Sequence, residues 1–278
     1  EIAGGYPVRI LRGRGEGPAA ARNLGWRAAK TPFVWFIDSD CVAEKDALDI
    51  LLGHMTCGEV GGVGGSYGNM CPDSLLACLI HEEIVARHRK MPSRVDFLGS
   101  FNVLYRRGVL EEVGGFDERF VTAEDADLAF RVTRAGHALA FDVRSRVKHF
   151  HPTGLRKYLK TQAEHGYYRV LLYAQHPGQA GGDAYSGFSD HIQPVLAASS
   201  IALAPLAPLV VPALAQIPLA ASLAAAQIPM TARIISETGS PRYAAFAAMS
   251  YIRAYARATG LARGAVEAAR TYLFGERN

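Results

Sequence analysis

Two aspartates, Asp38 and Asp40, directly follow the apolar run 33–37. Aromatic and β-branched residues dominate that run, which predicts a strand buried on both faces inside a parallel sheet. Ligands of open α/β sheets lie beyond the carboxyl ends of the strands, and two carboxylates there would suit a hard cation shared with substrate phosphates. An Asp-Ser-Asp triplet can equally be a polar turn, so these residues alone leave both interpretations open.

A second acidic cluster, Glu124, Asp125 and Asp127, stands at the start of a predicted helix, with Thr122 as the expected N-cap. The helix dipole favours acids there, and Asp127 can pair with Arg131 one turn later. Three carboxylates in four positions exceed what capping requires. Because Glu124 and Asp127 share one helix face while Asp125 points about 100° away, we expect structural and chemical roles to be divided among them.

A predicted strand over 141–149 ends in His149, and alternation places His151 on the same face. One neutral imidazole could join Asp38 and Asp40 on a metal, although a pair of hydrogen-bonded structural histidines is the alternative.

Two glycine-containing segments could contact a substrate. The basic loop 13–17 precedes a helix that we expect to begin at Pro18, and its amides could hold a phosphate with help from Arg22; an ordinary strand-to-helix connection is the alternative. The mostly apolar stretch 95–105 is interrupted by Gly99, Ser100 and Asn102. Small polar residues there suggest a wall that touches substrate, or a β-bulge.

The C-terminal part changes character. A glycine-rich linker is expected over 178–190, and no Asp, Glu, Lys or Arg occurs from 192 to 232. Forty uncharged residues suit two membrane crossings of about 20 residues each, with buried helices of a soluble protein as the alternative. Arg253, Arg257, Arg263 and Arg270 then lie within 243–274, whose pattern suggests a basic amphipathic helix on an anionic membrane face.

Composition narrows the function classes. The net charge of +4 over 278 residues comes from scattered Lys and Arg, which argues against a nucleic-acid partner. The four cysteines include no Cys-x-x-Cys pair, which favours reduced thiols over a zinc site or a disulfide framework. The given sequence does not begin with Met or with a leader sequence, and residues 8–11 are predicted to form a short strand that would need neighbouring strands in a sheet. We therefore expect an N-terminal portion to precede residue 1.

The order and spacing of four motifs resemble the family-two glycosyltransferases of GT-A fold. The motifs are 17–25 with Arg22 and Asn23, 36–40 with the Asp-x-Asp element, 114–131 with Gly-Gly-Phe-Asp and Glu-Asp-x-Asp, and His149. The resemblance implies an α/β catalytic domain over 1–175, a partial GT-A mixed sheet with flanking helices that lacks its first nucleotide-binding portion. A linker over 176–191 and membrane-associated helices over 192–278, a transmembrane hairpin plus an interfacial helix, would follow.

The resemblance also implies the site. Asp38, Asp40 and His149 would hold Mg²⁺ or Mn²⁺ on the diphosphate of a nucleotide-sugar donor. The Glu124–Asp125 pair would supply the base, with Asp125 as the base itself. Substrate contacts would come from Arg22, Asn23, Gly99, Ser100 and Asn102.

The predicted reaction is a single displacement with inversion, which transfers the sugar to a lipid-linked or glycan acceptor. We expect it to take place at the inner (cytoplasmic) membrane, with the catalytic domain facing the cytoplasm. The nearest match to the processive Gln-x-x-Arg-Trp motif is 162–166, which argues against processive polymerisation. We expect the isolated chain to be inactive without its nucleoside-binding half. The alternatives are a metal-dependent nucleotidyl- or phosphotransferase and a non-catalytic membrane-anchored binding protein. All of these predictions require the two acidic clusters to converge on one site.

Overall fold

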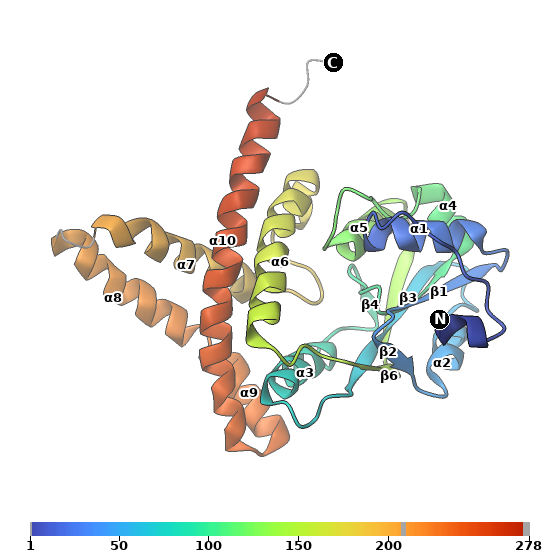
Figure 1. Ribbon diagram of the computed structural model, residues 1–278, viewed down its shortest axis with the longest axis horizontal. Coiled ribbons are helices and arrows are strands. Elements are labelled where there is room, and N and C mark those ends of the chain that lie inside the picture. Colours follow the sequence, from blue (N-terminus) through green and yellow to red (C-terminus); the bar gives the residue numbers. More distant parts are fainter. Residues whose placement is uncertain (1, 207–209, 275–278) are drawn as a thin grey trace.

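The computed structural model describes the backbone of residues 2–206 and 210–274, and side chains within 4–206 and 214–270 (Figure 1). These residues contain one six-stranded mixed sheet. The strands are β1 (Phe33–Ile37), β2 (Cys41–Ala43), β3 (Val60–Asn69), β4 (Arg94–Val95), β5 (Asn102–Arg106) and β6 (Ala138–His149). Their order is β1-β5-β3-β6-β2, with β4 also paired to β6.

Pairing within the sheet is mostly antiparallel, and β3 and β6 form its parallel pair. This mixed sheet with flanking helices confirms the predicted fold class. The placement of β1 was wrong, because it pairs antiparallel with β5 at one end of the described sheet and is only partly buried. An apolar run indicates burial, but it does not determine which strand becomes the neighbour.

Five helices accompany the strands in the first half of the chain. They are α1 (Pro18–Ala28), α2 (Ala47–His54), α3 (Leu75–His88), α4 (Arg107–Val113) and α5 (Glu124–Arg134). Pro18 stands in the first turn of α1 as predicted, where its missing N–H costs nothing. Leu128 and Val132 of α5 pack with Val103 of β5 and Leu139 of β6 in the largest core cluster. This packing fixes the start of α5 against the sheet.

The second half is helical and leans against the first (Figure 1). Its helices are α6 (Leu155–Gln175), α7 (Phe188–Leu203), α8 (Val210–Ala225), α9 (Ile228–Thr238) and α10 (Ala245–Phe274). Short 3-10 turns lie at Ile2–Gly5, Pro177–Gln179, Ala204–Leu206 and Pro241–Ala244. A shared core joins α3 to the later helices through Cys78, Tyr158, Ile234 and Phe246. The half that contains the sheet and the helical half that begins with α6 are therefore packed together.

Glycines set the distance between α6 and α10. A Cβ added at Gly166 would collide with the carbonyl oxygen of Arg257, and one at Gly260 would collide with that of Ala163. Only residues without a side chain permit this close approach of two helix backbones. The arginines of α10 are thereby brought against α6.

That packing corrects the predicted membrane contact of Arg253 and Arg257, whereas Arg263 and Arg270 of α10 are exposed and their contact with a membrane stays a prediction. Arg253 is 4% exposed and binds Glu83 of α3 and Tyr158 of α6, while Arg257 binds Gln162 of α6. Arg253 and Arg257 share one face of α10, and that face packs against α3 and α6 instead of a membrane. The predicted strand over 8–11 is likewise wrong, since these residues have no strand structure and Val8 and Ile10 are exposed.

The uncharged stretch forms a projecting pair, α7 and α8, followed by α9 (Figure 1). Helix α7 already begins within the predicted linker, and residues 207–209 of the stretch lie outside the described residues. By length and composition, one segment in the described part of the chain, Leu214–Thr238, could cross a membrane, which is weak evidence for a membrane protein. Two crossings stay a prediction.

Candidate active site

The two acidic clusters meet, and Arg22 of α1 joins them. Its guanidinium donates to Asp38 Oδ1 at 2.7 Å and to Glu124 Oε1 at 2.6 Å. The three residues come from α1, the end of β1 and the start of α5. Carboxylates that are 86 positions apart in the sequence (124 − 38) therefore share one cation. This confirms the convergence that the sequence analysis required.

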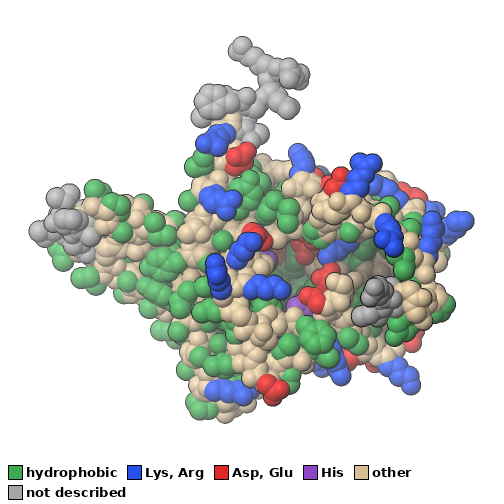
Figure 2. All heavy atoms as spheres, in the orientation of Figure 1, with side chains coloured by type: hydrophobic (Ala, Val, Ile, Leu, Met, Phe, Trp, Pro, Cys, Tyr) green, Lys and Arg blue, Asp and Glu red, His purple; other side chains and the backbone are tan. Residues whose placement is uncertain are grey.

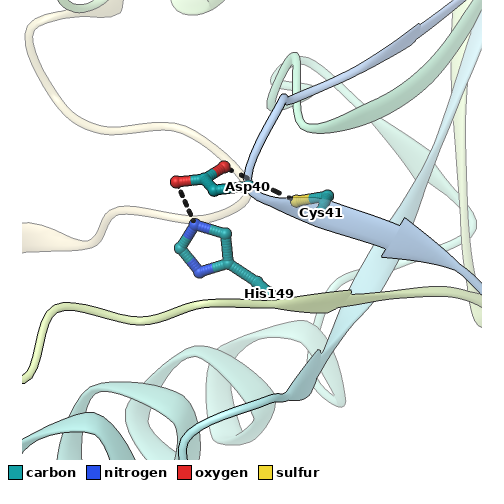
Figure 3. Close-up of side chains that lie close together, drawn as sticks. All are labelled: Asp40, Cys41 and His149. Atoms are coloured by element: carbon teal, nitrogen blue, oxygen red, sulfur yellow. Dashed lines mark hydrogen bonds and ion pairs between the residues drawn. The ribbon is translucent and has the colours of Figure 1, made fainter. Parts of the chain in front are cut away.

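Asp40 and His149 face one another beyond the ends of β1 and β6 (Figure 3). His149 Nε2 lies 3.3 Å from Asp40 Oδ2, because β2 pairs Cys41 directly opposite His149. A carboxylate oxygen and an imidazole nitrogen at this separation could both bind one divalent cation. These donors fit a divalent cation. The third predicted ligand, Asp38, is not part of this group and is bound to Arg22 instead.

The third potential donor here is Cys41, which the sequence analysis did not single out. The ligand atoms of Asp40, Cys41 and His149 lie within 4.8 Å of one another. Burial, with the nearby charges of Asp38 and Asp40, raises the pKa of the Cys41 thiol to about 12. Thiolate ligands favour softer metals such as zinc, whereas carboxylates suit Mg²⁺ and Mn²⁺, so Cys41 is a poor ligand for either of these two cations.

Two further histidines orient His149. Its Nδ1 lies 3.0 Å from His151 Nδ1, and His151 Nε2 lies 3.3 Å from His81 Nδ1 of α3. Burial lowers the pKa of His151 to about 3 and that of His81 to about 4, so both are neutral near pH 7. These contacts occupy Nδ1 of His149 and leave Nε2 directed at Asp40. His81 was missed by the sequence analysis because nothing local relates α3 to the end of β6.

Helix α5 begins differently from the prediction. Ala123, not Thr122, is the N-cap residue and has a left-handed φ of 70°, while buried Thr122 Oγ1 has no hydrogen-bond partner among the described residues. A non-glycine residue with this φ carries backbone strain. The turn places the side chains of Glu124 and Asp125 at the sheet edge next to Gly99, whose Cβ position is 3.8 Å from Asp125 Oδ2.

Burial changes the acidity of these two acids. It raises the pKa of Glu124 to about 7, helped by the charge of Asp125 and opposed by Arg22. Burial also raises the pKa of Asp125, opposed by the Ala126 amide and by Arg22. Because the two groups interact, they release protons as a pair. A carboxyl group whose pKa lies near neutrality suits general base catalysis.

Asp127 has the structural role that the sequence analysis assigned to part of this cluster. Its side chain is fully buried, accepts from Arg131 at 2.6 Å and lies 2.8 Å from His176 Nε2. Arg131 also donates to the carbonyls of Val113 and Gly115, so the network holds the Gly-Gly-Phe-Asp turn. The predicted pairing of Asp127 with Arg131 is confirmed.

Two predicted substrate contacts are corrected, because the fold uses their amides. Asn23 is 1% exposed and bonds both the amide and the carbonyl of Phe116, while Asn102 is fully buried between Trp35 and Ser145. Ser100 is 4% exposed. Gly99 lies beside Asp125, and Arg22 is 17% exposed between the acidic clusters. These two positions remain predicted substrate contacts.

A cavity of about 550 Å³ extends from Glu124 and Asp125 between the two halves of the chain. Its other walls come from α3, α6, α7 and α10 and include Arg169, Tyr173 and Arg257. Figure 2 shows this side of the molecule, with acidic and basic side chains around the hollow between the halves. The volume is within the range of sites for small ligands. Sequence reasoning missed this wall because its residues are distant from every motif.

The amino-acid sequence was then compared with known proteins. Residues 1–167 match the family described as Glycosyltransferase like family 2. The chain belongs to this glycosyltransferase family. The match covers most of the predicted catalytic domain and confirms the resemblance noted from the four motifs.

The chain is similar to the pre-mycofactocin glycosyltransferase of Mycobacterium tuberculosis (strain ATCC 25618 / H37Rv). The two sequences are 32% identical over 179 residues, which cover 62% of this chain and 38% of the relative. The O-antigen chain rhamnosyltransferase WbaN of Salmonella anatum is 26% identical over 182 residues, covering 60% of this chain and 56% of the relative. The chain thus spans roughly two to three fifths of the length of these relatives. The mannosyltransferase PcManGT from Pyrobaculum calidifontis, solved with GDP-Man and Mn²⁺, is similar in structure with a TM-score of 0.46 and 19% identity, over 97% of this chain and 70% of that one.

Proposed function

We propose that this family-two glycosyltransferase moves a sugar from a nucleotide diphosphate donor to a hydroxyl group of a saccharide or lipid-linked acceptor, with inversion at the anomeric carbon. The observation that supports this most directly is the Arg22 bridge between Asp38 and Glu124. It brings a carboxylate suited to a metal–diphosphate and a carboxyl pair suited to a base into one site.

Asp40 and His149, with Asp38 beside them, would hold Mn²⁺ or Mg²⁺ at the donor diphosphate. Such a cation, when bound, neutralises charge on the leaving diphosphate. His151 and His81 keep Nε2 of His149 available, as their hydrogen bonds occupy its other nitrogen. These residues therefore bind and orient the leaving group.

Asp125 is the proposed base. It accepts the proton of the acceptor hydroxyl as the hydroxyl oxygen attacks the anomeric carbon, and the bond from that carbon to the diphosphate oxygen breaks. Nearby Gly99 lets the Phe101 ring pack closely beside the carboxylate, since a Cβ at this position would lie 2.6 Å from that ring. Because the acceptor attacks the anomeric carbon directly in this single displacement, the configuration inverts.

The helical half would provide the acceptor side and the membrane attachment. The projecting α7–α8 pair has exposed apolar side chains at Val195, Ile201, Leu214 and Ile217, and it shows almost no charged side chains in Figure 2. An uncharged projection of this kind suits insertion into the inner membrane, with the catalytic half on the cytoplasmic side where nucleotide sugars are made. The O-antigen relative supports an envelope glycan or its lipid-linked precursor as the acceptor.

The test uses protein expressed from its complete gene in lipid nanodiscs. UDP, GDP and dTDP are titrated by calorimetry with and without Mn²⁺, and one of them should bind at least tenfold more tightly with the metal. Anomeric configuration of the released or transferred sugar, followed by NMR from the matching donor, should invert. Retention of configuration, or no coupling between metal and any nucleoside diphosphate, would rule out the proposal.

A further inference from the structure

The cavity beside Asp125 has four arginines in its walls, and three of them have carboxylate partners. Arg87 binds Asp190 and Glu83, Arg253 binds Glu83, and Arg169 binds Asp183 at 3.3 Å. These three arginines face three acids, so their charges balance.

Arg257 is the fourth. Its Nε donates to the neutral side chain of Gln162 at 2.9 Å, and no carboxylate oxygen of the described residues lies within ion-pair distance of its guanidinium. Burial and the neighbouring Arg253 lower the pKa of Arg257 to about 10, so the side chain is still charged near neutral pH. Among the described residues, Arg257 is therefore the arginine of this cavity wall that has no carboxylate in direct contact, although Asp190 and Glu83 act on its charge from a longer distance.

The backbone holds Arg257 in this position. The carbonyl of Arg257 lies against Gly166, where any side chain would collide with it, and Gly260 makes the same close approach one turn later. Arg257 is half-buried, so part of the hydration of its guanidinium is lost without a contacting carboxylate to replace it, and a charged group held in this way is a candidate for binding a ligand. The free ends of a guanidinium match the paired oxygens of a phosphate or carboxylate.

We infer that the acceptor carries an oxyanion, a phosphate or a carboxylate, and that Arg257 binds it. This inference rests on the proposed function, because it places the acceptor hydroxyl at Asp125 and the anionic group at the α10 wall of the same cavity. The apolar α7 side of the cavity, with Pro194 and Val195, would accommodate the less polar part of such a molecule. A neutral sugar alone would leave Arg257 unpaired.

The experiment measures binding of four probes by calorimetry to the nanodisc protein: farnesyl phosphate, inorganic phosphate, glucuronate and, as the uncharged control, farnesol. At least one oxyanion should bind and should lose tenfold or more in affinity in R257Q. If only farnesyl phosphate binds, the anionic group of the acceptor is a lipid phosphate. Binding of inorganic phosphate would indicate a free phosphate group, and binding of glucuronate would indicate a sugar acid. R257K should retain part of the affinity, and R263Q, an exposed arginine on the same helix, should behave like the wild type.

A second measurement does not depend on the variants folding. Phenylglyoxal modification of wild-type Arg257, followed by peptide mass spectrometry relative to Arg263, should slow in the presence of the oxyanion that binds. Equal affinities in R257Q and wild type, or no oxyanion binding or protection at millimolar concentration, would overturn the inference. Coupled binding of Mn²⁺ and nucleoside diphosphate is measured separately on the wild type, so failure of the proposed function is distinguishable.

Discussion

The two acidic clusters of this glycosyltransferase use the same residue types in opposite environments. The side chains of Asp38 and Asp40 at the strand end are 33% and 54% exposed, whereas those of Glu124 and Asp127 on α5 are 9% and 0% exposed. Exposed carboxylates can bind an incoming cation without a large desolvation cost. Buried carboxylates either acquire a raised pKa, as Glu124 does, or require permanent partners, as Asp127 does. Burial, more than residue type, therefore separates the roles that we propose for these acids in metal binding and proton transfer from the structural role of Asp127.

Arg22 connects the two environments. Its guanidinium contacts one carboxylate from each cluster and packs over the Phe116 ring at 5.6 Å. The charge of Arg22 lowers the pKa of Glu124, against the larger effect of burial. A ligand that draws Asp38 away from Arg22 would consequently alter the acidity of the buried pair. The four predictions that follow test this separation of roles.

The largest effect is expected for Asp125→Asn. If Asp125 is the base, kcat should fall by about 10²- to 10⁴-fold, because the amide cannot accept the acceptor proton. Binding of nucleoside diphosphate with Mn²⁺ should change little, as should the thermal melting transition. Steady-state transfer assays and calorimetry on the same preparation measure both quantities. A kcat within threefold of wild type would remove Asp125 from the mechanism.

Asp127→Ala should affect stability instead. Removing one partner from the buried Asp127–Arg131–His176 group should cost about 3 kcal/mol in the free energy of unfolding. Chemical denaturation followed by tryptophan fluorescence measures this change. Arg107→Ala, which breaks a solvent-exposed pair with Glu111, is the control and should cost less than about 1 kcal/mol. Similar losses in both variants would contradict the buried structural role.

Asp40→Asn should weaken the metal dependence of donor binding. Loss of one of the proposed ligands should reduce apparent Mn²⁺ affinity by about tenfold or more, while the melting temperature stays close to that of wild type because Asp40 is exposed. Asp73→Asn, an exposed acid just before α3, is the matched control. Manganese titrations with nucleoside diphosphate present follow the change. Identical titration curves for Asp40→Asn and wild type would place the metal elsewhere.

The smallest expected effect is on the pH profile. Because the pKa of the Glu124–Asp125 pair is raised, activity should increase as pH rises through about 7, where the pair loses a proton. The stability contribution of Glu124 has the opposite dependence: it is complete below the unfolded pKa of about 4.5 and is lost as pH rises through about 7. Glu124→Gln removes a neighbouring negative charge and should move the rising limb of kcat to lower pH. An unchanged profile in Glu124→Gln would show that Asp125 titrates independently of Glu124.

Local sequence was a good guide where chemistry and periodicity agree. The strand over 33–37 and the helix beginning at Pro18 both form where they were predicted. Local sequence was a poor guide to which groups these side chains would bond in the folded protein. Thr122 did not become the N-cap, and the amides of Asn23 and Asn102 serve the fold, since a buried amide is satisfied by whichever backbone group packs nearby.

The sequence by itself determined which residues could do the chemistry: the acids at 38, 40 and 124–127, the histidine at 149 and the uncharged stretch near the C-terminus. Only the tertiary structure decided that Arg22 joins the two acidic clusters, that His81 orients His149, and that Arg257 faces a cavity instead of a membrane. Residue types are given directly by the sequence, and the periodicity of a single helix or strand follows from local backbone geometry. Exposure, pKa and ion pairing depend on segments that are far apart in the chain and meet only after folding.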